Sequence, residues 1–280
     1  MQAIFTAASG IKNMQTRLDT IASNIANINT IGYKAKRLDF KDTLYKALVL
    51  PDEADAELIR LAPAEQTEEG APAEGNGEEV PPVETILDKY VLIGSGVRIS
   101  STTTDFKDGA TKTTGTATDL AISGRGFFTL ESDAGERLYT RNGSFTVSSS
   151  GYLVNANGYF VLDNQGQRIM LTGDTFGLKV SDRGELSFPD GYVATLGLAD
   201  FNNLNGLEAA GDSCYRATAA SGQPLQAEVG AVLQGYLENS NVDMANDLTM
   251  LIRSQRAFSL MSKALQTADD MEGLANNIHN

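Results

Sequence analysis

The first thirty residues carry apolar side chains at the spacing of a helix that packs along one narrow seam. The apolar residues recur in steps of three and four, at Ile4, Ala8, Ile11, Met14, Leu18, Ile21, Ile25 and Ile28. A mean step near 3.5 residues is typical of a coiled-coil seam, which is narrower than the apolar face of a helix on a globular core. The pattern predicts an N-terminal helix that pairs with another helix and is closed by Asn29, Thr30 and Gly32, with Gly32 suited to the left-handed exit.

The last forty residues show the same pattern. Asn241 or Asp243 can cap the start of a second helix, and Asp247 lies in a first turn, where the helix dipole favours acids. The apolar stripe then runs through Leu248, Leu251, Phe258, Met261, Leu265, Ala268, Met271 or Leu274, and Ile278, with Gln255 as its polar interruption. Two seams at opposite ends of one chain are expected to pair with each other, with neighbouring molecules, or with both.

Polar residues within the first seam favour assembly over a purely local core. Asn24 and Asn27 alternate with Ile25 and Ile28, and asparagines on a seam specify register and partner at some cost in stability. The alternative is that the two stripes simply pack together within one monomer. The predicted assembly interface comprises Ile11, Leu18, Ile21, Asn24, Ile25, Asn27, Ile28, Leu248, Leu251, Gln255, Phe258, Met261, Leu265 and Ile278.

Between the helices the period changes from that of a helix to that of strands. Short runs rich in Val, Ile, Leu, Phe, Tyr and Thr alternate with glycine-containing turns. The predicted turns are 133–136, 149–152, 155–159, 164–167, 182–185 and 189–192. Such spacing is typical of antiparallel hairpins. The predicted fold class is therefore α+β, mainly β, with a central all-β antiparallel domain, barrel-like or an irregular sandwich, and N- and C-terminal helices that pair as a coiled coil.

One segment holds most of the charge of the chain. Residues 52–88 contain twelve acidic residues and one basic residue, Arg60, so they carry −11 of the net charge of −14. The segment is also rich in proline, and such a composition cannot bury enough apolar surface to offset its ordering entropy. The sequence therefore predicts four parts: 1–50 with the first helix, a flexible acidic insertion at 51–88, a β domain at 89–238, and the second helix at 239–280.

Candidate chemistry is sparse. His279 is the only histidine and Cys214 the only cysteine, which removes most histidine- or cysteine-based catalysis and metal binding. The Gly-Arg-Gly at 124–126 is flanked by strands rather than a helix, so close strand approach explains it better than a phosphate site. Asn142-Gly143-Ser144 matches a glycosylation sequon but equally suits a turn. We expect no enzyme activity, no cofactor, no metal, no nucleic acid partner and no membrane span.

Four ordered blocks resemble the flagellar basal-body rod and hook protein family. The terminal blocks are LDTIASNIANINTIGYKAKRLDFKDTLY (18–45) and GYLENSNVDMANDLTMLIRSQRAFSLMSKALQTADDM (235–271). The inner blocks are GSGVRISSTTTDFKDGATKTTGTATDLAISGRGFF (94–128) and YTRNGSFTVSSSGYLVNANGYFVL (139–162). The resemblance covers nearly the whole chain outside the acidic insertion.

The resemblance implies a structural subunit of the flagellar basal body that self-assembles into a helical tube and transmits torque. It implies export by the flagellar type III apparatus, in keeping with an N-terminus that lacks the pattern of a secretory signal. The implied partners are further copies of the chain, neighbouring rod and hook subunits, and ring or bushing proteins.

Alternatives stay open at this point. Residues 217–243 resemble the distal-rod type, whereas residues 103–109 also suit the proximal-rod type, and a hook subunit would need a further outer domain. A different class of function is a secreted β-domain binding module dimerised by its terminal helices. The long insertion departs from the family pattern, and it either contacts neighbouring subunits or is a tolerated solvated loop.

Overall fold

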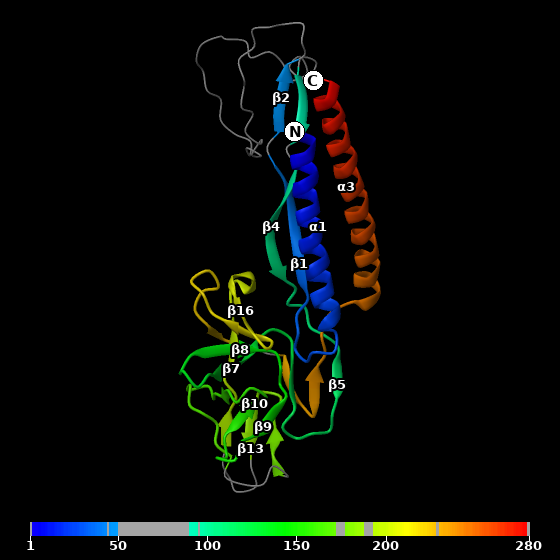
Figure 1. Cartoon of the computed structure of the whole chain (residues 1–280). Helices are drawn as coiled ribbons and strands as arrows, with labels where there is room; N and C mark the ends of the chain where they lie inside the picture. The colour runs from blue at the N-terminus through cyan, green and yellow to red at the C-terminus, as the bar shows by residue number, and fades with distance from the viewer. Residues whose placement is uncertain are drawn as a thin grey trace, which may run out of the picture. The chain divides into compact units, whose positions relative to one another are not determined.

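The computed structural model describes residues 2–43, 45–49, 90–94, 96–171, 177–187, 193–227 and 230–278. Two long terminal helices, α1 (Gln2–Ala26) and α3 (Met244–Ile278), flank a series of short strands (Figure 1). The strands pair antiparallel, so the predicted α+β, mainly β class is confirmed. Within the described ranges no helix is both long and apolar enough to cross a membrane.

The described strands fall into two groups along the chain, four that precede the β domain and the rest, which belong to it. Outside the β domain they are β1 (Lys36–Asp42), β2 (Tyr45–Val49), β3 (Tyr90–Gly94) and β4 (Val97–Thr104). Those that follow are β5 (Thr111–Thr113), β6 (Leu120–Ser123), β7 (Phe127–Glu131), β8 (Arg137–Thr140), β9 (Phe145–Val147), β10 (Leu153–Asn155), β11 (Phe160–Val161), β12 (Lys179–Val180), β13 (Glu185–Ser187), β14 (Val193–Thr195), β15 (Leu198–Asp200), β16 (Glu208–Gly211), β17 (Cys214–Arg216), β18 (Leu225–Gln226), β19 (Ala231–Gln234) and β20 (Tyr236–Glu238), with the 3₁₀ turn η2 (Leu204–Gly206).

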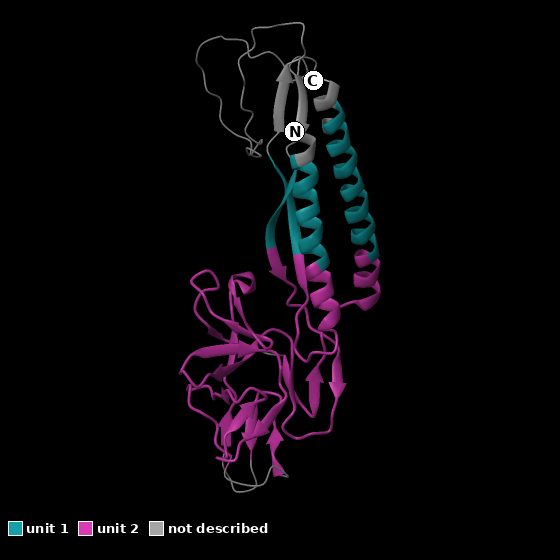
Figure 2. Cartoon of the chain, in the orientation of Figure 1, with its two compact units in different colours: residues 1–18, 38–101, 252–280 teal, residues 19–37, 102–251 magenta. Residues whose placement is uncertain are grey.

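The chain forms two compact units, coloured separately in Figure 2. Unit 1 comprises residues 1–18, 38–101 and 252–280, and unit 2 comprises residues 19–37 and 102–251. Unit 1 contains most of both helices, most of the paired strands β1 and β4, and the antiparallel pair of β2 and β3. Unit 2 contains the β domain, the last turns of α1 and the first turns of α3. The predicted insertion at 51–88 lies outside the described residues, and the predicted domain limits stay predictions.

The two terminal helices contact each other within unit 1, as their apolar stripes predict. At Gly10 of α1 an added Cβ would lie 3.1 Å from Sδ of Met261 on α3. The start of α3 is capped by Asp243, whose Oδ1 accepts hydrogen bonds from the amides of Ala245 (3.1 Å) and Asn246 (3.2 Å). The cap satisfies two of the amides that a helix leaves without an intrahelical partner. The sequence prediction of a cap at this point is confirmed.

Gly273 offers a direct test of α3, because it lies inside the helix and a Cβ there would meet nothing within 4 Å. Gly273→Ala is expected to stabilise the helix by up to about 1 kcal/mol, since glycine is the least favourable residue but proline in a helix interior. The measurement is thermal loss of helical circular dichroism. Gly10→Ala is the matched control, in which contact with Met261 offsets the gain. Lower helicity in Gly273→Ala would contradict the assignment.

The β domain is built around one sheet of nine strands. Its order is β16-β17-β8-β7-β11-β10-β9, and β15 pairs with both β7 and β18. Hairpins and bridges confirm five of the predicted turns, which join β7 to β8, β9 to β10, β10 to β11, residue 162 to 168, and β12 to β13. The sixth predicted turn, 189–192, lies outside the described residues, and β14 begins directly after it.

Both faces of the central strand β7 are buried, each in a different cluster. Phe128 packs into the main apolar core with side chains such as Leu130, Phe145 and Val161. Phe127 points the other way, since successive strand residues alternate between faces. It packs with Tyr139, Phe201 and Tyr215, and with Phe106 at a ring-centroid distance of 5.6 Å. The central strand of the sheet is therefore packed on both faces.

Candidate functional site

The predicted assembly residues of α1 are mostly covered within the subunit. Ile21 and Asn24 are buried, and Ile11, Leu18, Ile25, Asn27 and Ile28 are half-buried. On α3 the side chains of Leu251, Phe258, Met261 and Leu265 are half-buried, whereas Leu248 and Gln255 are exposed. The side chain of Ile278 lies outside the described residues. Whether these residues contact other subunits stays a prediction.

Among the side chains of α3 that the structure describes, Ser254 is a buried polar one that the sequence did not indicate. Gln255 was predicted as the polar interruption of the seam, but its side chain is exposed, and the neighbouring Ser254 is only 3% exposed. A helix turns about 100° per residue, so Gln255 lies on a different side of α3 from the buried Ser254. The predicted role of Gln255 in assembly stays a prediction. Serine and glutamine are both polar, so the apolar pattern alone does not show which of the adjacent positions, Ser254 or Gln255, is buried.

The asparagines of α1 use their hydrogen-bonding groups within the subunit. Asn24 Oδ1 accepts from the amide of Lys36 (2.9 Å) and the hydroxyl of Tyr33 (3.2 Å), and its Nδ2 donates to the Lys36 carbonyl (3.0 Å). Asn27 Nδ2 donates to the Ser23 carbonyl (2.8 Å). These bonds hold the segment that follows α1 against the end of the helix. The structure therefore gives Asn24 a positioning role inside the subunit.

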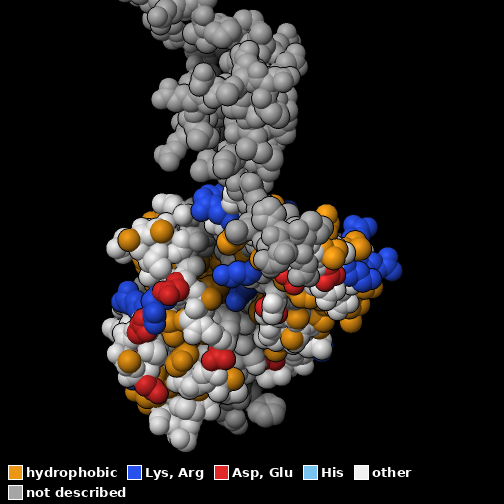
Figure 3. Space-filling model, turned by 45° about the horizontal axis from the view of Figure 1, so that its top comes forward, with side chains coloured by type: hydrophobic (Ala, Val, Ile, Leu, Met, Phe, Trp, Pro, Cys, Tyr) orange, Lys and Arg blue, Asp and Glu red, His pale blue; other side chains and the backbone are white. Residues whose placement is uncertain are grey.

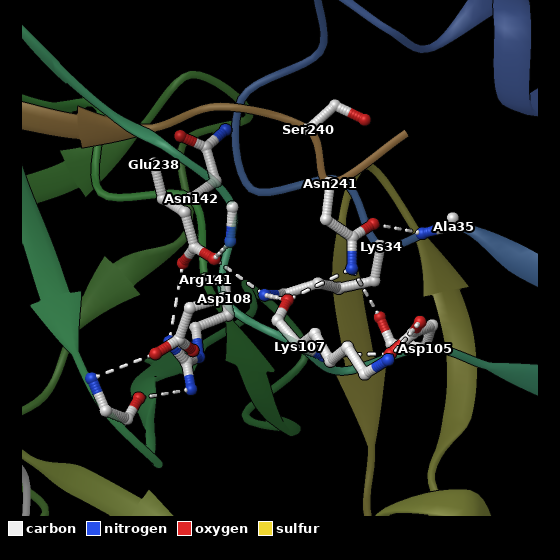
Figure 4. Close-up of polar contacts among 12 residues, drawn as sticks. Lys34, Ala35, Asp105, Lys107, Asp108, Arg141, Asn142, Glu238, Ser240 and Asn241 are labelled. Atoms are coloured by element: carbon white, nitrogen blue, oxygen red, sulfur yellow. Dashed lines mark hydrogen bonds and ion pairs between the residues drawn. The ribbon is translucent and has the colours of Figure 1, made fainter. Parts of the chain in front are cut away.

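A buried group of charges joins that segment to the β domain (Figure 4). We call Lys34, Asp108, Arg141 and Glu238 the ionic junction. Lys34 Nζ lies 2.6 Å from Glu238 Oε1, and both side chains are 1% exposed. Arg141 Nη1 lies 3.4 Å from Glu238 Oε2 and 3.3 Å from Asp108 Oδ1. One carboxylate thus pairs with cations from two segments that lie far apart in the sequence.

Backbone groups complete the ionic junction. Lys34 Nζ also donates to the Lys107 carbonyl (2.7 Å), and Arg141 Nη2 donates to the Gly124 carbonyl (2.7 Å). The amide of Gly109 donates to Glu238 Oε1 (2.8 Å). Within the described part of the chain, Arg141 Nε is the one buried side-chain nitrogen or oxygen that has no partner. Buried charges are tolerated when they are paired and hydrogen-bonded, and this junction meets that condition almost completely.

Asn241 closes the same region from the C-terminal side. Its Oδ1 accepts from the amide of Ala35 (2.7 Å), and its Nδ2 donates to the carbonyls of Asp105 (2.7 Å) and Lys107 (3.0 Å). The amide of Gly32, which has a φ of +66°, donates to the Glu238 carbonyl (2.8 Å). The segment after α1 and the segment before α3 are therefore bonded to each other as well as to the β domain.

Burial shifts the pKa values of two charged groups in this region. The pKa of the Lys34 ammonium is lowered because burial disfavours its charge, and the Glu238 carboxylate partly offsets this effect. The pKa of Asp247, in the first turn of α3, is raised by burial, and a hydrogen bond with Asn24 partly offsets it.

Other candidate motifs have structural explanations. Gly124 and Gly126 have φ values of +93° and +136° in the turn between β6 and β7, and the Arg125 side chain pairs with Asp200 at 3.3 Å. No cluster of His, Cys, Asp or Glu suited to a metal ion occurs among the residues described. On the face drawn in Figure 3, basic side chains are scattered among acidic and apolar ones and form no continuous patch.

Sequence reasoning missed the ionic junction, although its residues lie in quoted blocks. Lys34 lies in the first block, Asp108 and Arg141 in the inner blocks, and Glu238 in the last. The available signal was a lysine and a glutamate beside apolar residues at the inner edges of the two helical regions. Pairing across 204 positions could not be read from spacing, because only the folded sheet brings these segments together.

Comparison with known proteins gives a consistent result along the chain. Three family models match it: "Flagella basal body rod protein" at 4–34, "Flagellar hook protein FlgE/F/G D1 domain" at 121–188, and "Flagellar basal body rod FlgEFG protein C-terminal" at 233–278. The flagellar basal-body rod protein FlgG of Agrobacterium fabrum is 35% identical, covering 98% of both chains. FlgG of Bacillus subtilis is 32% identical, covering 97% of this chain and 96% of its own.

A further Bacillus subtilis relative, the flagellar hook-basal body complex protein FlhP, is 29% identical and covers 99% of both chains. The family-model matches fall on both helical regions and on the β domain, and the FlgG similarity extends over the whole length. This agrees with a structural rather than an enzymatic role. The chain belongs to the flagellar basal-body rod protein family and is a structural subunit of the rod, of the FlgG type.

Proposed function

We propose that this rod subunit polymerises through its two terminal helices into a helical tube that transmits torque from motor to hook. Membership of the family implies assembly with rod and hook subunits. The observation that carries our proposal is a second apolar surface on α3. Leu260 is 67% exposed, Met271 70% and Leu274 63%, whereas Leu251, Phe258, Met261 and Leu265 on the other side of the same helix are half-buried within the subunit.

The geometry of the helix separates the two surfaces of α3. Leu260 and Met271 are eleven positions apart, which places them within about 20° of each other around the helix. Phe258 and Leu265 lie on another side, where they are half-buried. A helix with apolar residues on more than one side is suited to packing against more than one neighbour. We propose that a second copy of this chain covers the outward surface, because a homopolymer presents the same helices at every position.

Within the rod we propose the distal segment. Residues 217–243 resemble distal-rod members, and whole-length relatives of more than 30% identity, such as those of Agrobacterium fabrum and Bacillus subtilis, carry the FlgG name. Copies of the chain are the proposed lateral neighbours, and ring or bushing proteins are proposed around the tube. Locating the subunit by electron microscopy of isolated basal bodies tests this position, which a subunit density confined to the proximal segment would contradict.

The polymerisation proposal predicts a strong effect of charge on the outward surface. In the variant Leu260→Glu with Met271→Glu, each contact between copies would bury carboxylates in an apolar surface, at a cost of several kcal/mol. We expect the critical concentration for polymerisation to rise at least about 100-fold, equivalent to roughly 3 kcal/mol. Sedimentation and electron microscopy measure polymer, and motility of cells carrying the variant measures function.

Two controls separate apolar character from substitution as such. Leu260→Met keeps the surface apolar, and Asp269→Asn changes charge at an exposed position that is not part of the apolar surface. Both are expected to polymerise normally. The double glutamate variant should keep the circular dichroism of the β domain, since surface changes rarely exceed about 0.5 kcal/mol. Polymers of unchanged yield in that variant would refute the assignment.

A further inference from the structure

A cavity of about 280 Å³ opens on the β domain, away from the ionic junction. Arg137 of β8 and Arg183 of the turn between β12 and β13 line it, together with Leu198 and Leu225. We call this cavity, defined by these four residues, the arginine pocket. Its volume accommodates one or two side chains rather than a folded element. Leu225 is 49% exposed, so the pocket combines basic and accessible apolar groups.

The two arginines differ from the other arginines of the β domain. Arg125, Arg141, Arg168 and Arg216 each form an ion pair, with Asp200, Glu238, Glu131 and Glu136 respectively. Among the described residues, the guanidinium groups of Arg137 and Arg183 make no hydrogen bond or ion pair. Arg137 lies opposite Glu131 in the β7–β8 register, and the two charges interact at longer range. Arg137 Nη2 would lie 3.1 Å from a Cβ built on Gly166, so its guanidinium extends over the turn that borders the pocket. These two arginines, whose side chains make no hydrogen bond or ion pair with another described residue, thus line the same pocket.

The chemistry of the pocket favours a carboxylate. A guanidinium presents paired N–H donors that match the two oxygens of a carboxylate. Asp163 also lines the pocket, but its Oδ1 already accepts from the amides of Gln165 (2.9 Å) and Gln167 (2.7 Å). The ionised side chains of the pocket therefore carry a net charge of about +1 before any partner binds. An acidic peptide with some apolar residues fits the combination of two arginines and two leucines.

The chain itself contains such a peptide. Residues 52–88 carry twelve of the acidic residues and −11 of the net charge, and their last part, EEVPPVETILD at 78–88, alternates acids with Val, Ile and Leu. We propose that the arginine pocket binds carboxylate side chains of the acidic segment 52–88 of a neighbouring copy of this chain. This inference rests on the proposed polymerisation.

A contact between pocket and segment suits a polymer because it joins two different surfaces of the same subunit. Such a heterologous contact leaves one pocket and one segment free at the ends, so it can repeat along a helical assembly. Each exposed arginine–carboxylate pair contributes only about 0.2–1 kcal/mol. Repetition in a polymer raises the effective concentration of the partner, and a weak contact then adds to the specificity of subunit arrangement.

A peptide-binding experiment tests the pocket without requiring polymer. The receptor is the full-length chain in which the acids of 52–88 are replaced by their amides, so that its own segment does not compete. A labelled peptide of residues 74–88 is titrated by fluorescence anisotropy. We expect saturable binding that weakens with salt and falls at least tenfold in the variant Arg137→Gln with Arg183→Gln. Absence of polymer in a separate assay would refute the proposed function while leaving this result interpretable.

Two matched controls give the experiment its specificity. Arg125→Gln removes the same charge from an exposed arginine outside the pocket, and it should change the affinity less than twofold. The peptide with Gln and Asn in place of its acids should not bind. Equal binding to the Arg137→Gln, Arg183→Gln receptor, or equal binding of the amide peptide, would overturn the proposal.

A cross-linking arm distinguishes a neighbouring copy from the same copy. A photoreactive phenylalanine analogue replaces Leu225 in heavy-isotope chains, which are mixed with unlabelled wild-type chains under assembly conditions. Cross-links from the heavy chains to light peptides of 52–88 would support the contact between copies. Cross-links only within heavy chains, or only to other regions, would overturn it.

Discussion

Replacing Glu238 with glutamine is expected to lower the free energy of unfolding by about 3–5 kcal/mol, the typical cost of breaking a buried ion pair. Glutamine has nearly the shape of glutamate and can still accept the hydrogen bond from Gly109. Its lost charge, however, leaves Lys34 and Arg141 facing a neutral group, and these side chains are 1% and 3% exposed. Asp108 remains as a partner for Arg141, but it is half exposed and compensates only in part.

A double-mutant cycle measures the pairing itself. Lys34→Met alone should cost less than Glu238→Gln, because Glu238 keeps Arg141 as a partner. The double variant Lys34→Met with Glu238→Gln should cost less than the sum of the two single variants. In the double variant no buried Lys34 ammonium is left without its carboxylate partner. Urea unfolding followed by far-ultraviolet circular dichroism gives the free energies. The chain contains no tryptophan, so tryptophan fluorescence is not an option.

A surface pair in the same region is the matched control. Lys107 Nζ and Asp105 Oδ2 are 3.9 Å apart, and the lysine side chain is 85% exposed. Lys107→Met should cost at most about 1 kcal/mol, because exposed pairs are screened by water. Similar losses in Lys107→Met and Glu238→Gln would contradict the view that burial gives the ionic junction its importance.

The pH dependence of the Glu238→Gln deficit has a definite sign. Burial lowers the pKa of Lys34, and the carboxylate of Glu238 raises it, so removing that carboxylate lowers the pKa further. Between this lowered pKa and the unfolded value of 10.5, the unfolded chain binds more protons, and stability rises with pH. That window is wider in the variant than in the wild type. The difference in stability between the two proteins should therefore shrink as pH rises from 7 towards 10.

The sequence indicated the parts of this fold that depend on local periodicity. The two helical stripes, the Asp243 cap and five hairpin turns follow from spacing and turn chemistry that involve residues close together in the chain. The same reasoning left residues 33–50 without secondary structure. They form β1 and β2, which pair with β4 and β3 from beyond the acidic segment. Strand pairing over such a distance leaves no periodic signal in either strand.

The candidate site was harder to predict than the fold for the same reason. The stripes located the surfaces of α1 and α3, but only the contacts of each residue show which side faces the other helix. Leu248 and Gln255 are exposed although the stripe includes them, and Leu260 is prominent outside it. Asn24 was recognised as unusual, yet its partners, Lys36 and Tyr33, come from a turn whose path the sequence did not specify.

Gly143→Ala is expected to destabilise the β domain by about 3 kcal/mol or more, at or above the upper end of what overpacking usually costs. The predicted turn at 142–144 lies directly against the start of β6. The amide of Leu120 donates to the Gly143 carbonyl (3.0 Å), and Asp119 bridges to Ser144. A Cβ at Gly143 would overlap the Leu120 carbonyl oxygen, at 1.6 Å, and approach Phe128 Cε2 at 3.2 Å.

The clash at Gly143 cannot be relieved by a side-chain rotation, because its partner is backbone. Either the turn moves away from β6 or β6 shifts against β19, and both changes disturb core residues such as Phe128, which is fully buried. Gly115→Ala is the matched control, since Gly115 has a φ of +73° but nothing within 4 Å of its added Cβ. It should cost only about 1–2 kcal/mol, the strain of a left-handed conformation. Urea unfolding compares the two, and a loss at Gly143 no larger than that at Gly115 would show that close backbone approach is not what requires glycine in this turn.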